Sequence, residues 1–279
     1  MAAIIATCSA EAKRGEMELG LRGKAALVTG ATSGIGLAAA RRLAEEGCNV
    51  AISGRDSERI AAAVASLAAA SSATVEGFPA DMRLPGEVRA LVERTVAALG
   101  GLDIVVSNAG THLPGRIDEV TPEALAAHLD TKVVGAWELA QQAAPHMRAR
   151  GGGRFIVVIG QAGKVPQASA IASAVVNAAQ HAFVKSLSDE LGRSNILVNA
   201  VCPSRIATPL TGKLALHDEV YLGRSLEQQQ SRWGADVPLG RWGEPEDVAD
   251  AIAFLASERA GFICGANIDV DGGHQRSIL

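Results

Sequence analysis

Aromatic residues are scarce in this chain of 279 residues, which contains five Phe, three Trp and a single tyrosine, Tyr221. Apolar residues nevertheless make up 48% of the sequence. The chain therefore has enough hydrophobic material for a sizeable core and is not globally disordered. Alanine and glycine supply much of the bulk, which indicates helices packed closely on a sheet.

Long apolar runs and a positive net charge are also absent. No stretch reaches the roughly 18 residues that a membrane-spanning helix needs, and residues 1–20 lack the basic start of a secretory signal. The formal charge of −4 argues against bulk recruitment of nucleic acid or of an anionic membrane. We therefore expect a cytoplasmic protein with neither nucleic acid nor a membrane as a partner.

Metal-binding patterns are missing as well. The four cysteines, Cys8, Cys48, Cys202 and Cys264, show no CxxC spacing, and the six His residues form no HxxxH or HExxH pair. These spacings predict incidental thiols in a reducing compartment, with neither a disulfide framework nor a metal site.

Short apolar runs alternate with helical patterns along the chain. Strands are predicted at residues 24–29, 48–53, 74–78, 102–107, 155–159, 196–201 and 268–270. Helices are predicted up to residue 46 and at 57–70, 85–99, 122–148, 169–191 and 245–256. Continuous apolar strands are typical of parallel strands covered on both faces. The sequence therefore predicts an α/β fold, a single doubly wound Rossmann-like domain with a parallel sheet of about seven strands.

The predicted domain covers residues 17–279, and Met17 is the expected start of its folded part. Residues 1–16 are predicted to be a disordered extension. Residues 208–238 interrupt the alternation of strands and helices, and we interpret this insertion as a substrate lid.

A glycine-rich turn separates the first predicted strand from its helix. Gly30, Gly34 and Gly36 allow a tight turn and let backbone N–H groups and the helix N-terminus approach a phosphate. Such a turn at the first strand-to-helix junction predicts a nucleotide site.

Several motifs, in chain order, resemble those of the short-chain dehydrogenase/reductase family. TGATSGIG at 29–36 matches TGxxxGIG, and SNAG at 107–110 matches NNAG with one change. Pro203 and TPL at 208–210 match PG…TPL, with Ser204 in place of Gly, and DVDGG at 269–273 resembles VDGG. The likeness spans about residues 19–273. It implies hydride transfer between a nicotinamide cofactor and a carbonyl or alcohol, in a homotetramer or homodimer built on helices 122–148 and 169–191.

The resemblance also implies a set of cofactor contacts: Gly30, Thr32, Ser33, Gly34, Ile35, Gly36, Arg55, Asp81, Met82, Asn108, Ala109, Gly110, Asn177, Pro203, Ile206 and Thr208. Gly54 stands where NAD-binding members place a carboxylate, and the Arg55 guanidinium suits a 2′-phosphate. These residues favour NADP(H) over NAD(H). In the alternative, Arg55 is a solvated surface residue and Asp56 caps a helix.

Four positions that carry the family's chemistry hold other residues in this sequence. The resemblance places the family's Asn, Ser, Tyr and Lys at Lys132, Gly160, Ser173 and Asn177. In the family the tyrosine donates the proton, and the lysine lowers its pKa and holds the ribose. Tyr221 cannot restore the motif in any register, because it lies in the insertion without a Lys four residues on.

Three functions follow from this combination. The first is a non-standard oxidoreductase for a small carbonyl or alcohol, with Lys132 as proton donor or electrostatic stabiliser and Ser173 hydrogen-bonded to the substrate. In the alternative for Lys132, it faces solvent or pairs with Asp130. The second function is a non-redox lyase, cyclase or isomerase. The third is a non-catalytic NADP(H)-binding sensor or inactive partner subunit. The family resemblance favours the first, with Lys132, Ser173 and Asn177 as candidate catalytic residues.

Overall fold

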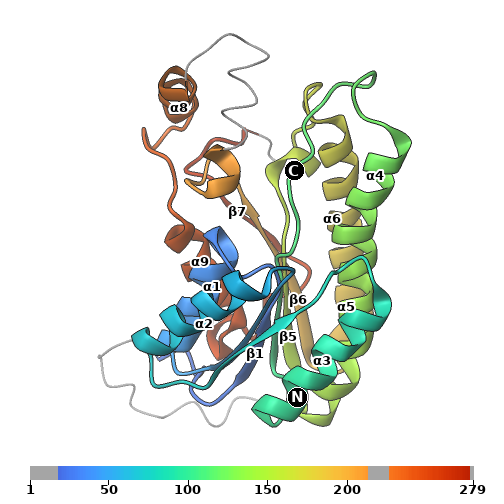
Figure 1. Cartoon of the computed structure of the whole chain (residues 1–279), viewed down its shortest axis with the longest axis vertical. Coiled ribbons are helices and arrows are strands. Elements are labelled where there is room, and N and C mark those ends of the chain that lie inside the picture. Colours follow the sequence, from blue (N-terminus) through green and yellow to red (C-terminus); the bar gives the residue numbers. More distant parts are fainter. Residues whose placement is uncertain (1–17, 213–225, 277–279) are drawn as a thin grey trace, which may run out of the picture.

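The computed structural model describes residues 18–212 and 226–276. The predicted extension, residues 1–16, and Tyr221 within the insertion lie outside these residues. The described part contains a seven-stranded parallel sheet with helices on both faces (Figure 1). The predicted fold class is confirmed.

The strands are β1 (Ala25–Val28), β2 (Asn49–Gly54), β3 (Val75–Pro79), β4 (Ile104–Ser107), β5 (Gly153–Val158), β6 (Ile196–Pro203) and β7 (Asn267–Val270). Their order in the sheet is β3-β2-β1-β4-β5-β6-β7. The chain builds outward from β1 in one direction through β2 and β3, and then in the other from β4 onward. Loops after β1 and β4 diverge at such a switch point, which opens a crevice at the carboxyl ends of the strands.

Two layers of helices cover the sheet. One face is covered by α1 (Gly34–Glu45), α2 (Ser57–Ala70) and α9 (Pro245–Ala256). The other is covered by α3 (Pro85–Leu99), α5 (Gly135–Ala149) and α6 (Ile171–Gly192), as Figure 1 shows. The remaining elements are α4 (Pro122–Leu129), α8 (Leu226–Ala235) and the short turns η1 (Asp130–Val134), η2 (Gln161–Gly163) and η3 (Glu258–Ala260). The helices at 57–70, 85–99 and 245–256 have the predicted bounds.

Successive residues of each central strand enter different halves of the core. On β1, Val28 belongs to the cluster that contains Ile252 of α9, whereas Leu27 belongs to the cluster that contains Leu139 of α5. Both strand residues are fully buried. A strand covered on both faces has no solvent-facing side, so it lacks polar alternation.

The region predicted as one helix, residues 122–148, is interrupted by the π-helical turn η1 between α4 and α5. Gln180 of α6 donates through Nε2 to the Lys132 carbonyl oxygen at 2.9 Å, so the neighbouring helix satisfies an acceptor of this turn. A Cβ on Gly135 would lie only 2.6 Å from the Met82 carbonyl oxygen. The turn therefore depends on tertiary contacts, and π-turns often mark functional sites.

Gly135→Ala should destabilise the fold by about 1–3 kcal/mol, because the added methyl meets backbone that cannot rotate away. Gly86→Ala is the matched control, since a Cβ at Gly86 in α3 meets nothing within 4 Å, and it should change stability by less than about 1 kcal/mol. Urea unfolding midpoints measure both effects. Equal midpoints for the two variants would contradict this packing account.

Candidate functional site

The glycine turn between β1 and α1 is closed against the loop that follows β4. Gly30 has φ +63°, and a Cβ there would lie 2.7 Å from the Ala109 Cα. Asn108 donates through Nδ2 to the carbonyl oxygens of Thr29 and Gly30, both at 3.0 Å. Ser33 precedes α1 and makes no side-chain cap. The first N–H groups of α1 therefore lie at the crevice, where they suit a phosphate.

At the end of β2, Gly54 has no side chain, and two arginines follow it in the sequence. A Cβ on Gly54 would lie 2.8 Å from the Thr32 Cγ2, so a larger residue at this position would displace Thr32. Arg55 is exposed, and Arg59 donates to the Ser33 hydroxyl at 3.1 Å. Asp56 caps α2 by accepting from two backbone N–H groups. Both parts of the alternative for this segment are thus correct, because Asp56 caps the helix and Arg55 is exposed at the surface.

Asp81 and Met82 lie after β3 at the edge of this region. Arg83 hydrogen-bonds the Asp81 carboxylate and lowers its pKa, despite the opposing effect of partial burial. Met82 is buried beneath Gly135. The structure thus places Met82 as a packing residue of the η1 turn.

A cavity of about 850 Å³ lies at the carboxyl ends of the central strands. It brings together these predicted residues: Gly30, Ser33, Gly34, Ile35, Gly36, Asn108, Gly110, Lys132, Gly160, Asn177, Pro203, Ile206 and Thr208. Five predicted cofactor residues, Thr32, Arg55, Asp81, Met82 and Ala109, do not line it, and neither does Ser173. The glycine turn and two of the three candidate catalytic residues, Lys132 and Asn177, therefore share one cleft.

Lys132 lies in the η1 turn and reaches across to α6. Lys132 is only 8% exposed, and its Nζ donates to the Asn177 Oδ1 at 2.5 Å. The aliphatic stem runs along the backbone of Gly110, where an added Cβ would be 3.1 Å from the Lys132 Cγ. The ammonium is therefore held between two helices at the cavity wall.

Burial lowers the pKa of Lys132 to about 8. No carboxylate within the described residues lies in ion-pair distance of it, and Asp130 is exposed. The alternative that Lys132 faces solvent or pairs with Asp130 is therefore wrong. One turn earlier, burial and the Lys132 charge lower the pKa of His128 to about 4. At neutral pH the Lys132 amine therefore carries a proton and the His128 imidazole does not.

Ser173 is held by backbone rather than presented to the cavity. It is 1% exposed. Its hydroxyl accepts from the Leu113 N–H at 2.8 Å and donates to the Leu113 carbonyl at 3.1 Å. A Cβ on Gly160 would be 3.0 Å from the Asn177 Nδ2. Ser173 thus fixes the loop that borders the cleft, and Gly160 leaves room for the Asn177 amide.

Sequence reasoning did not identify three further polar residues at this cleft. Gln161 of η2 and Ser204, after β6, line the cavity. His274 lies behind them, with its Nδ1 at 3.0 Å from the Ser204 Oγ. The only signal in the sequence is Ser204, which departs from the glycine of the family's PG…TPL segment.

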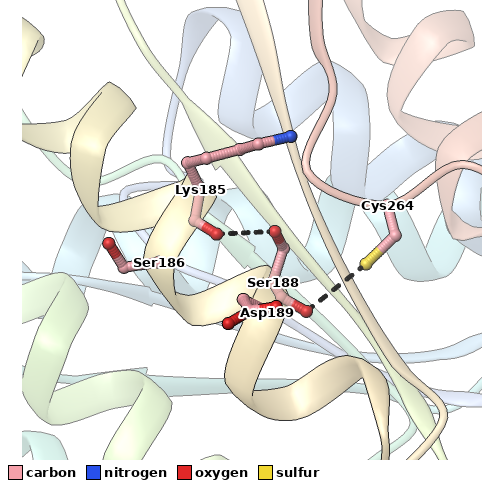
Figure 2. A pocket seen from close by; sticks show the side chains of 5 residues that line it. All are labelled: Lys185, Ser186, Ser188, Asp189 and Cys264. Carbon is pink, nitrogen blue, oxygen red and sulfur yellow. Dashed lines mark hydrogen bonds between the residues drawn. The ribbon is translucent and has the colours of Figure 1, made fainter.

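A second depression, of about 500 Å³, lies beside Lys185 and Cys264 and contains none of the predicted site residues. Figure 2 shows its hydrogen bonds, from the Ser188 Oγ to the Lys185 carbonyl and from the Cys264 Sγ to the Ser188 carbonyl.

The thiols of Cys48 and Cys202 lie elsewhere, and burial raises the pKa of each to about 12. In the part of the chain that the structure describes, no cluster of His, Cys, Asp and Glu suits a metal, and no helix is long and apolar enough to cross a membrane.

Comparison with known proteins agrees with this geometry. A family model described as enoyl-(acyl carrier protein) reductase matches residues 30–275. The chain belongs to the short-chain dehydrogenase/reductase family. This short-chain dehydrogenase/reductase is 34% identical over 253 residues to a putative ketoacyl reductase of Streptomyces coelicolor, covering 89% of this chain and 95% of the relative.

Solved structures of other family members show the same fold. L-sorbose reductase from Gluconobacter frateurii, complexed with NADPH and L-sorbose, is 34% identical with a TM-score of 0.89, covering 94% of this short-chain dehydrogenase/reductase and 100% of that chain. A variant of the actinorhodin polyketide ketoreductase with NADPH is 33% identical with a TM-score of 0.88, covering 91% and 98%. These three relatives are all named as reductases.

Proposed function

We propose that this protein binds NADP(H) and interconverts a carbonyl and an alcohol by hydride transfer, with an altered set of catalytic residues. The observation that carries the proposal is the contact between the Lys132 ammonium and Asn177 at the wall of the cavity. The reductase names of the compared relatives support this function over a non-redox enzyme or a non-catalytic binding protein.

The choice of NADP(H) is supported by the residues around the end of β2. An acid at position 54 would recognise the 2′-hydroxyl of NAD, but a side chain there would collide with Thr32. Arg59 instead places a guanidinium group on Ser33 of the turn, and the exposed Arg55 follows β2 directly. Guanidinium groups suit a 2′-phosphate. Two of the related structures hold NADPH.

Two of the four altered catalytic positions amount to an exchange of side chains. By the family resemblance, Lys132 stands at the Asn position and Asn177 at the Lys position. The contact between them supports the idea that Lys132 places its ammonium in the part of the cleft where the family's lysine lies, but from the η1 turn. The cleft thus keeps a positive charge, which now comes from a side chain of η1 instead of α6.

Lys132 has the properties of the proton donor in this arrangement. A bound nicotinamide would supply the hydride. With a pKa of about 8, the Lys132 Nζ holds a proton at neutral pH and releases it more readily than an ordinary lysine. Asn177 Oδ1 orients the ammonium, and Ser173 positions the loop at Leu113 instead of contacting substrate.

Exposed apolar residues on the helices predicted to form subunit contacts support a homo-oligomer. Trp137 on α5 is 59% exposed and Val175 on α6 is 51% exposed. The Trp137 ring lies 5.8 Å from the ring of Phe183, so the two helices share one apolar surface. Such a surface suits a second copy of the chain.

Lys132→Met should lower kcat/KM for NADPH-dependent ketone reduction by about 10²- to 10⁴-fold, because one positioned general acid contributes that much. Wild-type protein is assayed on ethyl acetoacetate and L-sorbose by nicotinamide absorbance and product mass. Lys185→Met, an exposed lysine of α6, is the control and should retain activity. Full turnover by Lys132→Met would contradict the role of Lys132, and product without an absorbance change would indicate a non-redox enzyme.

Arg55→Ala should weaken NADPH binding by about 10- to 100-fold, as expected for the loss of a charged hydrogen bond, and leave NADH binding unchanged. Arg89→Ala, at an exposed position on α3, is the matched control. Fluorescence titration with both cofactors measures the effect. An equal loss for NADH and NADPH would show that Arg55 does not recognise the 2′-phosphate.

A further inference from the structure

Three side chains from separate segments meet at one wall of the cavity. The Ser204 Oγ lies 2.5 Å from the Gln161 Oε1. The His274 Nδ1 lies 3.0 Å from the Ser204 Oγ and 3.1 Å from the Gln161 Oε1. The three polar atoms form a closed triangle, in which Gln161 and Ser204 line the cavity.

The chemistry of the three atoms assigns the hydrogens of this triangle. An amide oxygen can only accept a hydrogen bond, so the Ser204 hydroxyl donates to the Gln161 Oε1. The His274 Nδ1 then carries a hydrogen and donates to one or both oxygens. The Gln161 amide is thereby held with its oxygen turned toward Ser204 and His274.

The chain is bent sharply to deliver His274. Gly272 and Gly273 have φ +62° and +83°, which favours glycine. The Asp271 carboxylate accepts from the backbone N–H groups of Gly273 at 2.9 Å and Gln275 at 2.7 Å. The imidazole is therefore placed by a preformed turn after β7 rather than by the triangle alone.

The orientation of Gln161 leaves one polar group unused. Within the described residues, its Nε2 has no hydrogen-bond partner, and the residue lines the cavity directly after Gly160. A side-chain amide N–H₂ is a donor that can stabilise negative charge on a substrate oxygen. Gly160 itself, at the position of the family's serine, has no side chain to do so.

We propose that Gln161 donates through Nε2 to the carbonyl oxygen of the substrate, and that Ser204 and His274 are positioning residues for this amide. The inference rests on the proposed function and names the group that stabilises the developing oxyanion. The ligand class is therefore a ketone or its alkoxide. Lys132 supplies the proton to this oxygen, and Gln161 supplies a fixed hydrogen bond.

Kinetics on ethyl acetoacetate with NADPH test this assignment. Gln161→Leu should lower kcat by about 10²- to 10³-fold, as does the loss of an oxyanion donor elsewhere, with unchanged NADPH affinity. His274→Ala should lower kcat by a smaller factor, and His274→Asn should restore it, because the Asn amide can donate in place of Nδ1. Gln141→Leu, an exposed position on α5, is the control. Unchanged kcat in Gln161→Leu would overturn the proposal.

A second readout needs no turnover. Ethyl acetoacetate labelled with ¹³C at the ketone is bound in the presence of NADP⁺, and its carbonyl stretch is recorded by infrared difference spectroscopy. The hydrogen bond should lower the frequency in the wild type, and Gln161→Leu should return it toward the free value. The same frequency in both proteins would overturn the proposal.

The two readouts separate this inference from the proposed function. If the wild type reduces no ketone but Gln161→Leu shifts the bound carbonyl frequency, the proposed function fails and the Gln161 contact stands. If the wild type reduces ketones and Gln161→Leu changes neither readout, only the inference fails. A wild type that neither binds nor reduces the probes would overturn both.

Discussion

The hydrogen bond between the Lys132 ammonium and the Asn177 amide is the interaction on which the cleft depends. It joins the η1 turn to α6 and holds a buried charge that has no acid beside it among the residues the structure describes. Desolvation of an ammonium is costly, and the cost appears as a lowered pKa. A lone buried lysine at a cavity wall is expected where its chemistry is used.

The surrounding structure holds this charge in place. Gln180 satisfies the Lys132 carbonyl in the π-turn, and Gly110 lets the lysine stem lie against backbone. On another wall, the Gln161 amide is fixed by Ser204 and His274. A substrate oxygen between these walls would face the Lys132 ammonium, which can donate a proton, on one side and the fixed Gln161 amide dipole on the other. Preorganised groups of this kind need no rearrangement during reaction.

Much of the fold could be predicted because its strands are continuous apolar runs separated by helices. The η1 turn could not, since it depends on Gln180 and on the close approach of Met82 to Gly135. The residue at each catalytic position was predictable from the resemblance, but the contact of Lys132 with Asn177 was not, because side-chain reach across helices is a tertiary property. His274 was missed for the same reason, as a chain reversal after β7 brings it to the cleft.

The most direct test of the account is the titration of Lys132 by NMR of its labelled Cε, alongside kcat for ketone reduction as a function of pH. We expect a pKa near 8 and a fall in kcat above it, because the neutral amine cannot donate a proton. The unfolded chain holds this proton up to a pKa of about 10.4, so stability should rise with pH between these values. An ordinary lysine pKa and a kcat that is flat through pH 8 would contradict the central role of Lys132.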